Sequence, residues 1–214
     1  MRGSVVSVNR GAVQVLHWRG RDYETGFIKT PVDEPVPVGP LGLEGDEQAN
    51  LTAHGGLHKA VYLYPREHYD AWMRELALSE LPAGSFGENL TVTGVDEGEL
   101  QLGDVLQVGG LQLLATEPRL PCMKLSVRFA REDMRERFSA SRRSGAYFSV
   151  EAEGIVTAGD AIERIHVSAS GWSVQAAFEV LTNMSADLDR VGSLSEVPWL
   201  SDRVRGKLLA RLSP

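Results

Sequence analysis

The stretch NLTVTGVDEGELQLGDVLQVGGLQLLAT, residues 89–116, decides the class of fold. Its apolar and polar residues alternate, which predicts strands at 89–93, 99–108 and 111–116 with glycine-containing turns between them. These turns are too short to contain the crossover helices that connect parallel strands. The stretch therefore favours a strongly curved sheet or a β-barrel over a parallel α/β sheet.

The rest of the first 166 residues continues this pattern of short strands. A hairpin is expected over 4–16. Two helices are expected to interrupt the strands, one beginning at Pro65 with the apolar spacing of an amphipathic helix and one over 127–139. The other segments that are expected to be extended are 25–29, 60–64, 146–151 and 154–166.

After about residue 167 the pattern becomes helical. Ser173 and Asp187 are each placed to cap a helix, and Pro198 is placed to open a third. The expected architecture is thus mainly β with inserted helices, with a curved-sheet or β-barrel domain over 1–166 and a three-helix C-terminal domain over 167–214. The apolar faces of the tail helices are free either to pack on the barrel or to form a homodimer.

Composition and missing motifs exclude several classes of function. The net charge is 22 − 29 = −7 and the pI is about 5.3, which disfavours a general affinity for nucleic acid or an anionic membrane. No apolar stretch is long enough to span a membrane, and the N-terminus lacks a signal peptide, so we expect a cytoplasmic protein with no nucleic-acid or membrane partner. The sequence also lacks the glycine-rich dinucleotide motif, the phosphate loop and the Gly-x-Ser-x-Gly motif of α/β-hydrolases.

The single cysteine, Cys122, lies in a segment with a restrained backbone, Pro118-Arg119-Leu120-Pro121-Cys122. One cysteine excludes an internal disulfide and any metal site with several cysteines. The neighbouring Arg119 and Lys124 place the thiol in a positive potential, which lowers its pKa and favours the thiolate that binds a soft metal or attacks an electrophile. The alternative is that Cys122 is a small buried hydrophobic residue.

The segment His54-Gly55-Gly56-Leu57-His58 has histidines four residues apart, which is the spacing of helical zinc ligands. The two glycines make a helix improbable and indicate a turn whose backbone amides approach an anion closely. The alternative is a glycine hairpin with an incidental histidine.

Four further polar residues are candidates for the site. Glu88 and Asn89 enter a strand and offer an acceptor and an amide to a polar ligand, or else they satisfy the local backbone. Lys29 ends an extended segment, where a lysine is usually solvated. Asp46 lies in a turn, and a functional role for it is the minority interpretation.

Taken together and in order, several segments resemble the MOSC domain, which is named after the C-terminal domain of molybdenum cofactor sulfurase. The resemblance is greatest to the bacterial YiiM-like branch of that family and covers nearly the whole chain. The tail, with Trp199, resembles the three-helix domain that follows MOSC in this branch. The resembling segments are GFIKTPV (26–32), LGLEGD (41–46), HGG with KAV (54–61), YPREHY (64–69), FGENL (86–90), LGD (102–104), PR with PC (118–122) and SVQAA (173–177).

The resemblance implies a MOSC-type β-barrel linked to the molybdenum cofactor, a pterin dithiolene that holds molybdenum. In the molybdenum-dependent members a cysteine thiolate ligates the metal, and Cys122 occupies that position. Lys29 and His54 match the basic and imidazole positions that meet the thiol, so Cys122, His54 and Lys29 are the expected catalytic residues. The residues expected to bind the cofactor are Arg119, Gly55, Gly56, Glu88 and Asn89.

The resemblance also implies a reaction, the reduction of N-hydroxylated compounds such as hydroxylamino purines, with electrons from a separate reductase. His54 would deliver a proton as the N–O bond breaks. Two alternatives stay open: a non-catalytic carrier of the cofactor, or of sulfur as a persulfide on Cys122, and metal-free thiol chemistry by Cys122 and His54. His58 departs from many relatives, which have Asp there.

Overall fold

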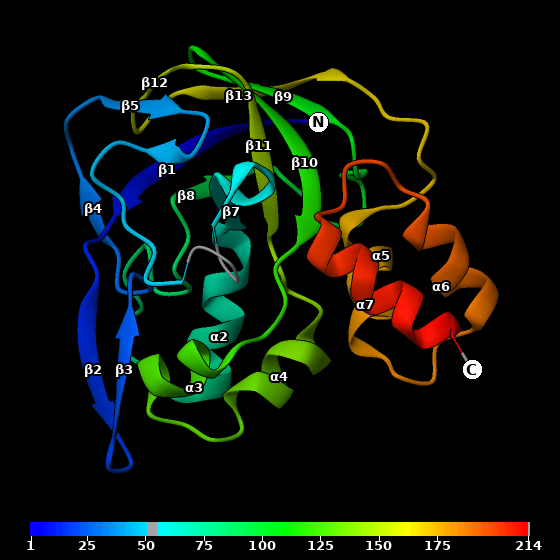
Figure 1. Ribbon diagram of the computed structural model, residues 1–214. Coiled ribbons are helices and arrows are strands. Elements are labelled where there is room, and N and C mark those ends of the chain that lie inside the picture. The colour runs from blue at the N-terminus through cyan, green and yellow to red at the C-terminus, as the bar shows by residue number, and fades with distance from the viewer. Residues whose placement is uncertain (51–54, 214) are drawn as a thin grey trace.

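Within residues 1–50 and 55–213, which the computed structural model describes, seven strands close into a barrel (Figure 1). Their order is β13-β9-β10-β11-β7-β8-β1, and β1 pairs with β13 to close the ring. The expected β-barrel is therefore confirmed. The strands are β1 (Arg2–Arg10), β7 (Val61–Pro65), β8 (Leu90–Thr93), β9 (Val105–Val108), β10 (Leu111–Pro118), β11 (Ala146–Ala152) and β13 (Ala161–His166).

The strand directions follow from the lengths of the connections. Neighbouring strands of the barrel are antiparallel, apart from the parallel pair β7 and β8. The connection between these two contains the helix α2 (Tyr69–Leu76), which supplies the crossover that a parallel pair needs. The expected amphipathic helix is thus confirmed, but it does not begin at Pro65, which is the last residue of β7 and is followed by the short 3₁₀ turn η2 (Arg66–His68).

The predicted hairpin over 4–16 is wrong. β1 pairs with β8 and β13, and its last residues pair with β4 (Thr30–Val32). The next strand, β2 (Gln14–Trp18), pairs instead with β3 (Arg21–Thr25) in a separate ribbon. Arg19 and Gly20 connect these two strands with φ angles of 54° and 73°, the conformation of a tight two-residue hairpin.

Turns interrupt two of the predicted long strands. Of 99–108 only β9 is a strand, and 154–166 divides into β12 (Gly154–Val156) and β13. Each interruption has a glycine with positive φ followed by an aspartate that accepts a backbone hydrogen bond from three residues earlier: Asp104 from Gln101 at 2.9 Å and Asp160 from Thr157 at 2.8 Å. β12 joins β5 (Val36–Gly39) and β6 (Gly42–Leu43) in a small sheet.

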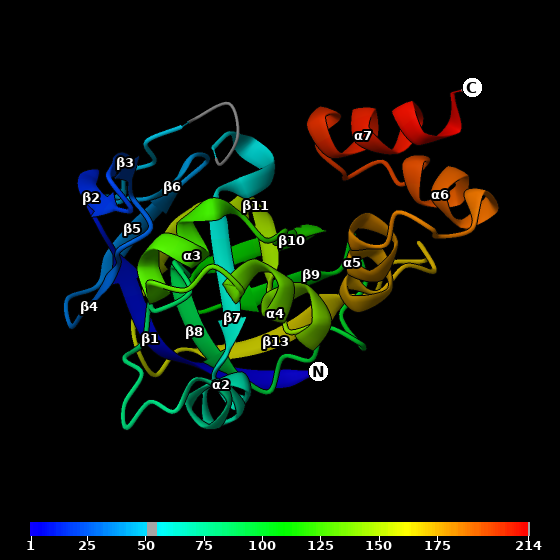
Figure 2. The ribbon, with the colours of Figure 1, turned by 90° about the horizontal axis from the view of Figure 1, so that it is seen from below.

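Helices cover one end of the barrel (Figure 2). The predicted helix over 127–139 is in fact two, α3 (Met123–Phe129) and α4 (Met134–Ser141), because Ala130 adopts a left-handed conformation with φ of 50° that ends α3. Aromatic side chains fill the space between these helices, α2 and the barrel, and Trp72, Phe86 and Phe138 are fully buried there.

In the described part of the tail, the chain forms the helices α5 (Val174–Thr182), α6 (Leu188–Ser195) and α7 (Asp202–Leu212). Ser173 and Asp187 cap the first two as predicted. The third helix does not open at Pro198, since its cap is Ser201, whose side chain accepts a hydrogen bond from the Val204 amide. Apolar side chains of these helices join the hydrophobic core of the barrel. The division into domains at residue 166 stays a prediction.

None of the helices in residues 1–50 and 55–213 is long and apolar enough to cross a membrane.

Candidate functional site

A cavity of about 300 Å³ opens where four loops meet at the barrel. Residues of the segments 24–29, 46–50, 86–89 and 119–124 line it, together with Tyr147 of β11. Its volume lies at the lower end of the range of about 300–1,000 Å³ for small-molecule sites.

Cys122 lies on the wall of this cavity, half-buried, at the position directly before α3. The Arg119 guanidinium reaches it with Nη2 at 3.6 Å from Sγ. The interpretation of Cys122 as a buried filler therefore loses support, because the thiol faces open space beside a cation.

Arg119 is a buried cation held mainly by aromatic rings. Only 3% of it is exposed, and its guanidinium carbon lies 5.1–5.6 Å from the ring centres of Phe27, Tyr62 and Phe138. Burial acts to lower the pKa of Arg119, but Cys122 and nearby tyrosine side chains favour the cation and raise its pKa above the ordinary value. Among the described residues, its Nη1 atom has no hydrogen-bond partner. One hydrogen-bonding group thus stays unused in a residue that lines the cavity.

A second cation, Lys29, is held by a carboxylate. Its ammonium forms an ion pair with Asp46, and the two side chains are 6% and 3% exposed. Asp46 also accepts hydrogen bonds from the Gly11 amide at 3.0 Å and from Asn89 Nδ2 at 2.9 Å. Burial lowers the pKa of Lys29, and the Asp46 charge opposes this shift. The minority interpretation of Asp46 thus gains support, since it fixes both Lys29 and Asn89 at the cavity.

Glu88 and Asn89 lie on different sides of the chain. Asn89 lines the cavity, and its Oδ1 accepts a hydrogen bond from the Tyr62 amide at 3.0 Å. Glu88 is fully buried behind the wall, where its carboxylate accepts hydrogen bonds from the Tyr69 hydroxyl, the Gly84 and Phe86 amides and Thr91. Burial raises the pKa of Glu88. Glu88 therefore shapes the loop before β8, and the geometry gives no support to its predicted contact with a cofactor.

The predicted histidine-glycine turn is only partly described. His54 lies outside the described residues. Gly56 has a φ of 89° and its carbonyl accepts a hydrogen bond from the Lys59 amide at 3.0 Å, which confirms a turn. Of the residues that the structure describes, Gly55 and Gly56 are not among those that line the cavity. His58 is exposed in the short 3₁₀ helix η1 (Leu57–Lys59).

The sequence analysis missed Tyr147 and Phe27, which line the cavity together with the predicted residues. Tyr147 reaches the site because β11 places it opposite Glu117 of β10 and Tyr62 of β7. Burial raises the pKa of Tyr147 to about 12, although Arg119 opposes the shift. No local motif marks either residue, and only the strand pairing identifies Tyr147.

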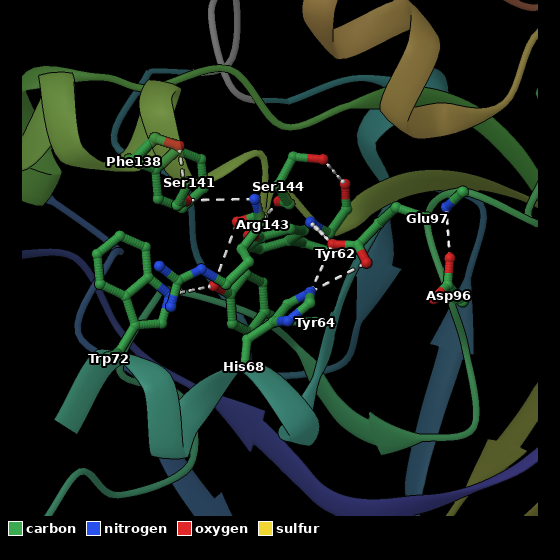
Figure 3. A network of polar contacts seen from close by, with 12 residues as sticks. Tyr62, Tyr64, His68, Trp72, Asp96, Glu97, Phe138, Ser141, Arg143 and Ser144 are labelled. Atoms are coloured by element: carbon green, nitrogen blue, oxygen red, sulfur yellow. Dashed lines mark hydrogen bonds and ion pairs between the residues drawn. The ribbon is translucent and has the colours of Figure 1, made fainter. Parts of the chain in front are cut away.

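A separate polar network lies among α2, α4 and the barrel (Figure 3). Most of its polar atoms are paired within it, but Arg143 Nη1 has no hydrogen-bond partner among the described residues. His68 Nε2 is 2.9 Å from a Glu97 oxygen, which also accepts a hydrogen bond from the Gly145 amide. The Arg143 guanidinium lies 4.1 Å from the Trp72 ring centre. These residues do not line the cavity, so we assign them to the packing of the helices.

Fold and cavity together define a class: a closed β-barrel that presents one thiol and two buried cations to a small-molecule cavity. The model of the MOSC domain matches residues 50–163, which is more than half of the chain. The chain belongs to the MOSC domain family.

Relatives extend the match to the tail. The chain is 35% identical to uncharacterized protein YflK of Bacillus subtilis over 98% of this chain and 95% of that protein. It is 37% identical to protein YiiM of Escherichia coli over 83% of this chain and 80% of YiiM. A protein of Gibberella moniliformis named Reductase is 30% identical over 84% of this chain, which matches only 32% of that longer protein. The crystal structure of YiiM from Geobacillus stearothermophilus superposes with a TM-score of 0.83, at 27% identity, and covers 99% of this chain and all of that one.

MOSC domains are generally associated with binding of the molybdenum cofactor, and the residues of the cavity fit such a group. The thiolate of Cys122 is a suitable ligand for a soft metal. The charges of the Arg119 guanidinium and the Lys29 ammonium are suited to anionic groups. No cluster of three or more histidine, cysteine or carboxylate side chains within 1–50 and 55–213 could hold a metal ion.

Proposed function

We propose that this protein is a molybdenum-cofactor-dependent reductase of N-hydroxylated compounds, such as hydroxylamino purines, with Cys122 as a thiolate ligand of the metal. The observation that carries the proposal is the pairing of Cys122 with the buried Arg119 guanidinium, 3.6 Å apart, on the wall of a cavity in a MOSC barrel. The name of the fungal relative adds support for reductase chemistry.

When bound, the cofactor supplies a metal centre that accepts electrons from a separate reductase and passes them to the substrate. The residues that line the cavity bind and orient the cofactor and the substrate. Arg119 holds Nη2 beside the Cys122 sulfur, and the charge of its guanidinium complements an anionic group of the cofactor. Phe27 and Tyr147 add aromatic surface that excludes water.

Reduction of a hydroxylamino group to an amine consumes two electrons and two protons and releases water. Lys29 holds a proton at Nζ beside the cavity, and its lowered pKa makes it a better proton donor than a solvated lysine. Asp46 keeps this ammonium in place. A proton from His54 stays a prediction, because His54 lies outside the described residues.

The test uses protein purified from a host that makes the cofactor. We expect molybdenum by elemental analysis and reduction of a hydroxylamino purine when an electron donor is supplied. Cys122→Ser should lose both, whereas Met123→Leu, which removes the exposed thioether next to it, should keep both. Molybdenum and activity retained by Cys122→Ser would exclude Cys122 as the ligand.

The partial exposure of Cys122 also suits a second function, a carrier that holds the cofactor and releases it to another protein. A carrier would transfer molybdenum to an apo-enzyme and show no turnover with any N-hydroxylated compound. Turnover by the purified protein with an electron donor would exclude a purely carrier role.

A further inference from the structure

The end of β10 is tied to the tail through one buried carboxylate. Glu117 is 2% exposed, and its two oxygens bind different distant segments. Oε1 forms an ion pair with Lys59 Nζ at 3.1 Å, and Oε2 accepts hydrogen bonds from Ser201 Oγ at 2.6 Å and from the Ser201 amide at 3.3 Å. A buried carboxylate depends on such partners, because it has given up its hydration.

The Ser201 side chain forms hydrogen bonds with both the barrel and the tail. Its hydroxyl donates to Glu117 and accepts from the Val204 amide at 3.4 Å, which caps α7. The negative charge of Glu117 thus lies at the N-terminus of an 11-residue helix, where it interacts favourably with the helix dipole. Figure 1 shows this end of α7 beside the end of β10.

On its other side, Glu117 reaches the wall of the cavity. Lys59 Nζ lies 5.6 Å from the ring centre of Tyr147, which lines the cavity and faces Glu117 across the β10–β11 ladder. Only Pro118 separates Glu117 from Arg119, the residue that contacts Cys122. The position of Glu117 therefore sets both the start of the Arg119–Cys122 loop and the support of Tyr147.

The loop before α7 has a second, independent anchor on the barrel. The ring of Trp199 lies against Gly103, so closely that a Cβ atom at Gly103 would come within 2.5 Å of it. Arg205 of α7 donates to the carbonyls of Val197 and Pro198 at 2.9 and 3.3 Å, which holds the same loop from the tail side. The loop that carries Ser201 is thus fixed to both parts of the molecule.

We propose that Glu117 is a positioning residue through which α7 fixes the Arg119–Cys122 loop, so that the tail is a working part of the cavity. The inference rests on the proposed function only in taking this cavity as the functional site. Its consequence is that a change at Ser201, on the tail, alters the environment of Cys122.

The test compares variants at helix caps in the cofactor-free protein. Ser201→Ala removes the hydroxyl that binds Glu117, and Ser201→Thr retains a hydroxyl. Ser173→Ala is the matched control, because Ser173 caps α5 through the Ala176 amide in the same way and does not contact Glu117. Should Ser201→Ala not fold, Ser201→Gly replaces it, since glycine is a better cap than alanine.

Two readouts report on the loop. Cys122 is the only thiol, so its alkylation by iodoacetamide, followed by intact mass, reports on this position alone. We expect Ser201→Ala to alkylate at least threefold faster than the wild type and to exchange amide hydrogens faster in 119–125. Ser201→Thr should restore wild-type behaviour, and Ser173→Ala should change exchange in α5 without changing alkylation.

Faster exchange confined to 198–212, with the alkylation rate of Cys122 unchanged, would overturn the proposal. So would equal effects of Ser201→Ala and Ser173→Ala on alkylation, because general loosening of the tail would then explain both. Neither readout needs molybdenum. A protein without molybdenum or activity would therefore refute the proposed function and leave this coupling to be judged on its own result.

Discussion

Removal of the Asp46 charge should destabilise the protein strongly, because it leaves the buried Lys29 without its ion-pair partner. Asp46→Asn keeps the shape of the side chain but puts an amide where an ammonium, the Gly11 amide and Asn89 all donate. Removing one partner of a buried ion pair costs about 3–5 kcal/mol. For a domain of this size each kcal/mol shifts the melting temperature by roughly 2–4 °C, so we expect a fall of roughly 6–20 °C.

The assay is urea unfolding followed by circular dichroism, applied to Asp46→Asn, to Lys29→Met and to the double variant. Each single variant should lose several kcal/mol, and the double variant should lose clearly less than the sum, since it removes both charges. Glu163→Gln is the control, because the Arg2–Glu163 pair has side chains 86% and 57% exposed and is worth less than about 1 kcal/mol. The reasoning would be refuted if Asp46→Asn cost no more than Glu163→Gln, or if the two single losses were additive.

Two further predictions concern the barrel and its contacts. Burial raises the pKa of Tyr62, Tyr64, Tyr69 and Tyr147 above 10.0. Their contribution to the free energy of unfolding is therefore complete below pH 10 and is lost as the pH rises above it, up to about 12 for Tyr147. The tyrosinate absorbance of these four residues should appear together with unfolding, and their ionisation in a folded protein would contradict this prediction. Gly103→Ala should lower the free energy of unfolding in urea by about 1–3 kcal/mol more than Gly159→Ala. Both positions have a positive φ, but only at Gly103 would the added methyl group meet the Trp199 ring. Equal losses would show that the Trp199 ring moves aside freely.

The sequence predicts the strands well and their partners poorly. Alternation along 89–116 identifies strands, and the short turns between them favour a curved sheet or a barrel over a parallel α/β sheet, whereas the closed barrel is implied by the resemblance to the MOSC family. Alternation does not show which strand a given strand pairs with, and the hairpin over 4–16 is wrong for this reason: β1 finds its partners at β8 and β13, far along the chain. The sequence also fails to predict the helix break at Ala130, because alanine is a good helix former and rarely adopts the left-handed conformation.

For the site, the residues and the family resemblance together predict several of the polar side chains that line the cavity and miss those placed by strand pairing. Cys122, Arg119, Lys29 and Asn89 all line the cavity. Glu88 does not line the cavity, because the side chains of consecutive residues point to opposite sides of the chain. The Asn89 side chain faces the cavity, so that of Glu88 is buried behind its wall.

The closure of the barrel has a consequence for how the protein is made. Arg2 of β1 pairs with Glu163 of β13, 161 positions later in the chain, so β1 cannot close the barrel until β13 has been synthesised. Until that partner leaves the ribosome, the nascent sheet keeps two unpaired edges, and such edges invite pairing with other chains. A message truncated upstream of β13 would thus yield an open sheet with an exposed edge on β1 and one on β9, rather than a smaller closed barrel.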